Sequence, residues 1–354
     1  MKFYIKHFSG TISEGGAVRN HAFYRHFSSY ANVKIVNIAS VHIFKRFINT
    51  LNFILYFSFK RNHHIYMHLG AIFVLFPTFL FRLGLGQIVF YFLDRLSKRH
   101  VLQIEVNDLP FEQNRDLELP NLPFIQSFQK RLFSFKRVGY DFASHSMRDY
   151  AVKMYNLRSD QCKVLLNGAD KIKEFDESLY DVLLKRCPGK LRYVYVGSMN
   201  KGRQIEDLIH IFEQSNHILY LLGTGGDWIE QTLRLKGIDN IFYLGSFSDS
   251  VALQISSLCD VGVIPYDESR LYYNICYPTK VSFYLAAGLP ILSTPLKETQ
   301  YVLQNKDVAQ FLPIACWNEF VSNTKIDDVD VLKQNVLRYR PQFYWDSILK
   351  DLNF

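Results

Sequence analysis

The residues best suited to chemistry lie between positions 260 and 294. An apolar run at 261–264 leads into a polar loop rich in tyrosine, and Pro278 then opens a helix-like segment that ends at Gly288. Another apolar run follows at 291–293. The pattern predicts a strand, a loop, a helix and a second strand, with Lys280 in the first turn of the helix.

Lys280 is well placed to bind an anion. The first turn of a helix has N–H groups without helical partners and a partial positive charge, which together favour phosphate. In an open sheet of parallel strands, ligands bind where the strands end and the following helices begin. Because the lysine adds a full positive charge at such a position, the segment predicts a site for a phosphorylated ligand.

The elements that must position this site recur along the whole chain. Short apolar runs alternate with segments of helical spacing, and in the second half each run ends in a glycine or proline turn. The expected strands are residues 3–8, 33–38, 65–68, 101–106, 139–144, 164–166, 191–196, 218–222, 241–244, 261–264 and 291–293. Helices are expected at 17–28, 205–213, 228–236, 250–257 and 281–287. This alternation predicts an α/β protein with doubly wound parallel sheets.

A chain of 354 residues is long enough for two domains. We expect an N-terminal domain over residues 1–167, a C-terminal domain over 168–335 and a C-terminal helix over 336–354 that packs back toward the first domain. The five cysteines lack the spacing of a metal or redox pair, and the first residues show neither a long apolar stretch nor a cleavage site. These features predict a cytoplasmic protein without a signal peptide.

Positive charge is concentrated in the first half of the chain. Residues 1–160 hold 21 Lys and Arg against 10 Asp and Glu, a net charge of +11, whereas residues 161–354 hold 20 against 23. A basic half suits nucleic acid, an anionic membrane face or a phosphorylated substrate. An ordinary solvated basic surface is the alternative.

Two apolar stretches bear on membrane contact. Residues 71–93 are long enough to cross a bilayer, but Arg82 near the middle would cost about 2.5–3.5 kcal/mol, so a buried or membrane-surface helix is favoured over a span. Residues 43–61 combine apolar bulk with basic residues near both ends, as helices that lie on membranes do. A core helix whose lysines extend to solvent is the other interpretation.

Six motifs in order along the chain resemble those of the GT-B glycosyltransferases, in particular the family-4-type retaining branch (glycosyl transferases group 1). They are the glycine turn at Gly15 and Gly16, VLLNGAD at 164–170, YVGSMNKG at 195–202 followed by Arg203, LLGTGG at 221–226, YLGSF at 243–247, and the Pro278–Lys280 corner with its run YLAAGLPI. The resemblance implies two Rossmann-like domains that face a cleft. The first would bind the acceptor and the second a nucleotide-sugar donor.

The resemblance also assigns roles to individual residues. Arg203 and Lys280 would stabilise the negative charge that grows on the leaving diphosphate, without a metal ion. The donor-binding positions would be Gly15, Gly16, Gly197, Lys201, Gly225, Phe247, Glu268, Tyr273, Asn274 and Pro278.

On the acceptor side, three polar residues end predicted strands. Glu105 and Asp108 are expected to contact the acceptor, and His68 is interpreted as an acceptor contact or a catalytic proton carrier.

One position departs from the family pattern. Relatives carry a glutamate that holds the ribose hydroxyls, and Phe283 stands at this position. Tyr272, Tyr273 and Asn274 are candidates to replace it. The tyrosine-rich loop is closest to that of certain bacterial hexosyltransferases.

We therefore expect a retaining, metal-independent hexosyltransferase that uses a nucleotide diphosphate sugar, with UDP-sugars favoured and no further cofactor. The acceptor would be a glycan or lipid-linked sugar in cell-surface polysaccharide synthesis. The enzyme would reach it at the inner face of the cell membrane by peripheral contact with anionic lipid. The alternatives are a nucleotide-sugar epimerase of the same fold, a non-catalytic GT-B partner protein and, with least support, a nucleic-acid binder.

Overall fold

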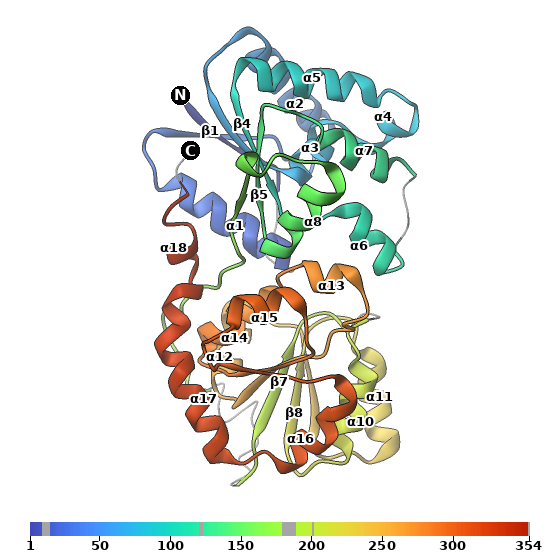
Figure 1. The fold of residues 1–354 in the computed structure, drawn as a ribbon, viewed down its shortest axis with the longest axis vertical. Coiled ribbons are helices and arrows are strands. Elements are labelled where there is room, and N and C mark those ends of the chain that lie inside the picture. Colours follow the sequence, from blue (N-terminus) through green and yellow to red (C-terminus); the bar gives the residue numbers. More distant parts are fainter. Residues whose placement is uncertain (9–14, 120–122, 179–188, 200–201, 353–354) are drawn as a thin grey trace. The chain divides into compact units, whose positions relative to one another are not determined.

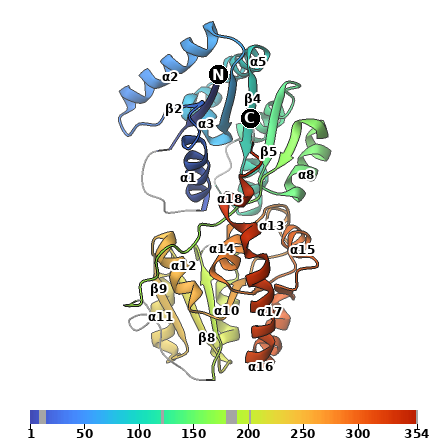
Figure 2. The same ribbon diagram turned by 90° about the vertical axis from the view of Figure 1, so that its left-hand side faces the viewer.

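Two parallel β-sheets, each with six strands, organise the chain. The computed structural model describes residues 1–8, 15–119, 123–178, 189–199 and 202–352. These residues form two compact units: unit 1 is Met1–Leu166 with Leu349–Phe354, and unit 2 is Asn167–Ile348. Helices cover both faces of each sheet (Figures 1 and 2). The predicted α/β fold with two doubly wound sheets is thereby confirmed.

Unit 1 contains the first sheet, in the order β2-β1-β3-β4-β5-β6 with every pair parallel. Its strands are β1 (Lys2–Lys6), β2 (Val33–Asn37), β3 (His64–His68), β4 (Val101–Val106), β5 (Val138–Phe142) and β6 (Cys162–Val164). Its helices are α1 (Gly15–Ser28), α2 (Ile43–Phe59), α3 (Leu69–Leu75), α4 (Thr78–Arg82), α5 (Gly86–Arg99), α6 (Pro110–Asp116), α7 (Phe124–Leu132) and α8 (His145–Tyr155), with a 3-10 turn η1 (Ser159–Gln161).

Unit 2 contains the second sheet, in the order β12-β11-β10-β7-β8-β9, again parallel throughout. Its strands are β7 (Arg192–Val196), β8 (Ile218–Leu222), β9 (Ile241–Gly245), β10 (Val261–Ile264), β11 (Ile291–Ser293) and β12 (Ala309–Phe311). Its helices are α10 (Ile205–Glu213), α11 (Asp227–Lys236), α12 (Asp249–Ser257), α13 (Leu271–Ile275), α14 (Thr279–Ala287), α15 (Lys297–Leu303), α16 (Trp317–Asn323), α17 (Ile326–Tyr339) and α18 (Trp345–Ile348), with 3-10 turns η2 (Ile314–Cys316) and η3 (Arg340–Phe343).

Each sheet has one point at which the strand order reverses. In unit 1 the chain runs from β1 to β2 and then returns to place β3 on the other side of β1. In unit 2 it runs outward from β7 through β8 and β9, and then returns to place β10 on the other side of β7. Connections leave in opposite directions at such a point, which opens a crevice at the carboxyl ends of the strands where ligands bind.

Residues 71–93 do not form the single helix that their apolar composition suggested. They are divided among α3, α4 and α5, because Pro77 precedes α4 as its N-cap and Gly84 has a φ of +76°. Proline cannot continue a preceding helix, and a positive φ is incompatible with helical geometry. Within the described residues, no helix is both long and apolar enough to cross a membrane.

Smaller differences concern the ends of elements. The strand expected at 3–8 ends at Lys6, and the helix expected from residue 17 begins at Gly15, so both predicted glycines of the first turn lie in α1. The remaining residues of that predicted loop, 9–14, lie outside the described part of the chain. In the C-terminal segment, the chain passes from α17 through η3 to the short helix α18.

Candidate functional site

In unit 2, the predicted anion site lies at the reversal point between β7 and β10. Gly197 directly follows β7, and Tyr266 follows β10 after one proline. Pro278 is the N-cap of α14, with a φ of −60°, and places Lys280 in the first turn of this helix. The predicted strand, loop, helix and strand of this region are therefore all present.

Lys280 is enclosed by aromatic rings. Only 9% of the residue is exposed. Its Nζ donates a hydrogen bond to the Tyr266 hydroxyl at 2.6 Å and lies 5.1 Å from the centre of the Tyr195 ring. Burial, reinforced by the nearby charge of Arg203, holds the pKa of Lys280 well below its usual value.

Arg203 brings a second cation to the same tyrosine cluster. Its guanidinium carbon lies 4.0 Å from the centre of the Tyr266 ring and 5.0 Å from that of Tyr273. Neither Arg203 nor Lys280 has an ion-pair partner among the residues that the structure describes. Two cations held together without a carboxylate form a site that favours a bound anion.

Gly197 makes room for Lys280. A Cβ atom at this position would lie 2.4 Å from the lysine Nζ, and the backbone has a φ of +143°. Only glycine combines this conformation with the required space. Gly197 thus has a specific neighbour, the Lys280 side chain, while its predicted contact with a donor stays a prediction.

Tyr284 closes the gap between the two strands behind Lys280. Its hydroxyl accepts a hydrogen bond from the Val196 N–H at 2.9 Å and donates one to the Val263 carbonyl at 3.2 Å. Tyr284, Tyr195 and Tyr266 were not among the predicted site residues. Tyr195 begins the motif YVGSMNKG and Tyr284 begins the run YLAAGLPI, but tyrosine in or near apolar strands also serves as an ordinary core residue.

The loop before α14 is organised by Asn274. Its amide donates hydrogen bonds to the carbonyls of Glu268 at 2.6 Å and Arg270 at 3.0 Å, and its oxygen accepts one from the Lys297 N–H at 3.2 Å. Asn274 therefore fixes the shape of the loop. Tyr273, from α13, contributes its ring to the surroundings of Arg203.

Other predicted donor-binding residues lie farther along the sheet. Gly225 follows β8 and Phe247 follows β9, which are one and two strands from β7. Gly15 and Gly16 belong to unit 1. Lys201 lies outside the described residues. Phe283 lies in α14 and is partly exposed, so the helix presents an aromatic ring where the resemblance suggested a glutamate.

In unit 1, four polar side chains at the reversal point form one buried network. The Arg19 Nε donates to Glu105 Oε1 at 2.6 Å, Glu105 Oε2 lies 2.6 Å from His68 Nδ1, and the Tyr4 hydroxyl lies 2.9 Å from His68 Nε2. No more than 2% of any of the four residues is exposed. His68 ends β3, as predicted, and Glu105 lies beside it in β4.

The network keeps Glu105 ionised and His68 oriented. Burial alone would raise the pKa of Glu105, but Arg19 and His68 lower it to about 2. A carboxylate at Nδ1 favours the tautomer that donates from this nitrogen, which leaves Nε2 to accept from Tyr4 when the ring is neutral. Because both ring nitrogens already have protein partners, an acceptor that contacts His68 must displace Tyr4. The catalytic role of His68 stays a prediction.

Asp108 and Arg19 make further polar contacts in unit 1. The Asp108 carboxylate accepts a hydrogen bond from the Asn107 amide at 2.7 Å just beyond β4 and is partly exposed. Its contact with an acceptor, like that of Glu105, stays a prediction. Arg19, which the sequence did not single out, also donates to the carbonyls of Leu165 and Leu166.

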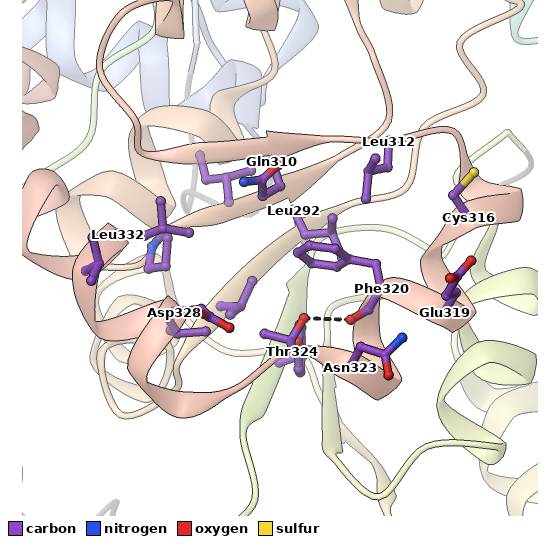
Figure 3. Close-up of a pocket in the computed structure, with 16 residues that line it drawn as sticks. Leu292, Gln310, Leu312, Cys316, Glu319, Phe320, Asn323, Thr324, Asp328 and Leu332 are labelled. Carbon is purple, nitrogen blue, oxygen red and sulfur yellow. Dashed lines mark hydrogen bonds between the residues drawn. The ribbon is translucent and has the colours of Figure 1, made fainter.

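A cavity of about 670 Å³ in unit 2 does not coincide with the cation site. The first residues of β10 and β11 and side chains of α16 and α17 line it (Figure 3). Lys280 and Arg203, in contrast, gather beyond the last residues of β7 and β10. None of the predicted site residues that the structure describes lines this cavity. The described residues also include no group of three or more His, Cys, Asp or Glu side chains that is arranged to hold a metal ion.

Comparison with known proteins gives a likeness in structure only. No protein-family model and no curated protein sequence matches the chain. WaaG, a glycosyltransferase involved in lipopolysaccharide biosynthesis, is similar with a TM-score of 0.66 at 11% identity, over 99% of this chain and 98% of that one. Sucrose-phosphate synthase from Thermosynechococcus elongatus is similar with a TM-score of 0.66 at 12% identity, over 99% of this chain and 96% of that one. HepE from Anabaena, in complex with UDP and glucose, is similar with a TM-score of 0.64 at 12% identity, over 99% of this chain and 98% of that one. Together with the two parallel sheets, these likenesses establish that the chain has the GT-B glycosyltransferase fold.

Proposed function

We propose that this protein is a glycosyltransferase that binds a nucleotide diphosphate sugar in unit 2. The observation that carries the proposal is the pair Lys280 and Arg203, which meet at the reversal point of the sheet without a carboxylate partner among the described residues. The diphosphate of the donor would supply the missing negative charge. The fold likeness to HepE, whose structure contains UDP and glucose, supports the same class of ligand.

The chemistry assigns the two cations to the leaving group. The bond between the anomeric carbon and the diphosphate oxygen breaks, the electron pair leaves with the nucleoside diphosphate, and the acceptor oxygen forms the new bond and loses its proton. Negative charge on the diphosphate grows in the transition state, so fixed cations in a tyrosine-lined site lower the barrier. Arg203 suits bidentate contact with phosphate, and Lys280 acts as a point charge.

The finer parts of the proposal follow the motif resemblance. We propose transfer of a hexose, with UDP-sugars favoured, with retention of configuration and without a divalent metal. The acceptor would be a glycan or lipid-linked sugar of a cell-surface polysaccharide. The reaction would take place at the cytoplasmic face of the cell membrane.

Calorimetric titration with UDP, GDP and ADP tests the donor site. We expect the wild-type protein to bind one of them and Lys280→Met to weaken that binding at least about tenfold, since a charge-assisted contact contributes roughly 1.5–3 kcal/mol. Lys236→Met is the matched control, because this lysine is exposed on α11 of the same unit and its ion-pair partner is Glu213. Unchanged affinity in Lys280→Met, or no binding of any nucleotide, would overturn the proposal.

A non-catalytic GT-B partner protein is the second candidate, and Phe283 is the observation that favours it. The ring offers no carboxylate to hold the ribose of a donor. Radiolabelled sugar donors offered with a bacterial lipid extract separate the candidates. Labelled lipid or glycan indicates transfer, whereas nucleotide binding with neither transfer nor sugar release supports the non-catalytic protein. Free sugar and UDP intermediates without an acceptor would instead indicate an epimerase.

A further inference from the structure

Helix α2 turns its most apolar side toward solvent. Residues 44, 48, 51, 55 and 59 follow one another at helical spacing and are all exposed, although they are Phe, Ile, Leu, Leu and Phe. The exposed fraction reaches 73% for Phe44, 64% for the neighbouring Phe47 and 79% for Phe59. A surface helix of a globular protein normally has polar residues on its solvent-facing side.

The opposite side of α2 already packs against unit 1. Phe53 and Phe57 are buried, and the Arg46 guanidinium donates hydrogen bonds to the carbonyls of Phe73 and Val74 at 3.2 and 3.1 Å. Packing of α2 within the unit therefore does not use the exposed apolar residues 44, 48, 51, 55 and 59, which we call the outer stripe. An apolar stripe that the fold leaves uncovered points to an external partner.

Helices near α2 in unit 1 also expose apolar side chains. The α2 residue Phe53 and the α5 residue Phe92 have ring centres 6.3 Å apart. The exposed apolar residues of α4, α5 and their connection are Phe79, Leu83, Leu85, Ile88 and Tyr91. More than half of the large apolar side chains that are exposed in the described chain belong to residues 41–91.

Charge identifies the kind of partner. Residues 41–100 hold eight Lys and Arg but only one acidic residue, Asp94. Lys45 lies near the start of α2, and Lys60 and Arg61 directly follow its end; all three are exposed. Aromatic and aliphatic residues between basic ends are typical of helices that lie in the interface of anionic membranes. A second copy of the chain is a poorer partner, because a symmetric pair would bring like charges together.

We infer that α2 and the exposed residues of α4 and α5 form a membrane-binding surface that lies on an anionic lipid bilayer. The helix of 17 residues would lie along the headgroup region rather than cross the bilayer. The outer stripe would enter the acyl boundary, and Lys45, Lys60 and Arg61 would contact lipid phosphates. This inference gives the proposed transferase a specific means of reaching a lipid-linked acceptor, but its test does not depend on transfer or on donor binding.

Flotation with vesicles tests the surface. We expect the wild-type protein to bind vesicles of phosphatidylcholine mixed with phosphatidylglycerol more strongly than vesicles of phosphatidylcholine alone. The triple substitution Phe44→Gln, Leu51→Gln and Phe59→Gln, called the outer-stripe variant, should weaken binding at least about tenfold, because it removes three of the five apolar side chains that the stripe would insert into the bilayer. Substituting Lys45, Lys60 and Arg61 by Gln should remove the preference for the anionic lipid and its sensitivity to salt.

The matched control substitutes Leu235 and Val331 by Gln, since both are highly exposed on helices of unit 2. This variant should bind vesicles as the wild type does. All outer positions are exposed, so circular dichroism and nucleotide binding should be unchanged in every variant. Equal vesicle binding by the wild type and the outer-stripe variant would overturn the inference. A wild-type dimer that becomes monomeric in the outer-stripe variant, with no vesicle binding by either, would also overturn it and assign the surface to self-association.

Discussion

At the scale of single residues, the cation site of unit 2 holds Lys280 in surroundings that disfavour its charged form. Burial lowers the pKa of Lys280, and the second cation, Arg203, lies on the same tyrosine ring. An arrangement of this kind reduces the stability of the free protein, which is common where a site is prepared for a ligand of opposite charge. Tyr266 contacts both cations and so sets their separation.

Gly197 allows a sharp test of this arrangement. We expect Gly197→Ala to weaken nucleotide binding, because the new Cβ would displace the Lys280 Nζ that it would otherwise approach to 2.4 Å. The substitution should also lower the free energy of unfolding by roughly 1–3 kcal/mol, since alanine is strained at a φ of +143°. Nucleotide titration and urea unfolding measure the two effects separately.

Gly237→Ala is the matched control for Gly197→Ala. This glycine also has a positive φ, but no atom lies within 4 Å of an added Cβ. The control should lose stability for the same backbone reason while keeping its nucleotide affinity. If both variants lose affinity equally, the space beside Lys280 is not what Gly197 provides.

At the scale of secondary-structure elements, the buried network joins α1 to strands β1, β3 and β4 of unit 1. Arg19 of α1 and His68 of β3 both contact Glu105 of β4. Glu105→Gln should destabilise the protein by roughly 3–5 kcal/mol, because it removes the carboxylate charge from the buried ion pair with Arg19. Urea unfolding at neutral pH measures this loss, and the exposed carboxylate of Asp149 provides the control Asp149→Asn.

The pH dependence of stability distinguishes the charge from the shape of Glu105. Its pKa is lowered from 4.5 to about 2 in the folded protein. The folded state therefore gains stability above pH 4.5, and this gain is lost as the pH falls toward 2. Glu105→Gln should lack this part of the acid sensitivity. If the variant and the wild type lose stability in parallel over this range, Glu105 is not ionised in the network.

The sequence predicted elements better than it predicted side-chain contacts. In unit 2, strands β7, β8 and β10 are directly followed by glycine or proline, and both the turn chemistry of 260–294 and the start of α14 at Pro278 are local properties that a single sequence reveals. The division of residues 71–93 into three helices depends on Pro77 and Gly84. Apolar composition alone does not indicate where these two residues interrupt the helix.

The contacts of Arg19 and Tyr266 could not be predicted, because they join residues that only the folded sheet brings together. Arg19 meets Glu105 across 86 positions of sequence, and Lys280 meets Tyr266 across a loop whose path the sequence does not specify. Arginine in an amphipathic helix normally faces solvent, and tyrosine after a strand is usually a core residue. Neither residue type distinguishes its role here from the ordinary one.

At the scale of the whole molecule, charge and apolar surface are distributed differently between the two units. Unit 1 contains the exposed stripe of α2 and most of the excess positive charge, and unit 2 contains the cation pair that suits a diphosphate. The outer-stripe variant of α2 should therefore bind UDP normally, while Lys280→Met should bind vesicles normally. This separation is expected because no residue of either set belongs to the other unit.

Transfer to a lipid-linked acceptor should depend on both the outer stripe of α2 and the cation pair of Lys280 and Arg203. With a lipid-linked acceptor in anionic vesicles, we expect both variants to lose transfer, the outer-stripe variant at least about tenfold, because membrane attachment raises the effective concentration of the acceptor. With the same acceptor dissolved in detergent, the outer-stripe variant should recover wild-type rates and Lys280→Met should not, since attachment no longer matters but the leaving group still needs its cation. Undiminished transfer by the outer-stripe variant in vesicles would contradict a role of α2 in reaching the acceptor. Failure to recover in detergent would place α2 in the catalytic machinery instead.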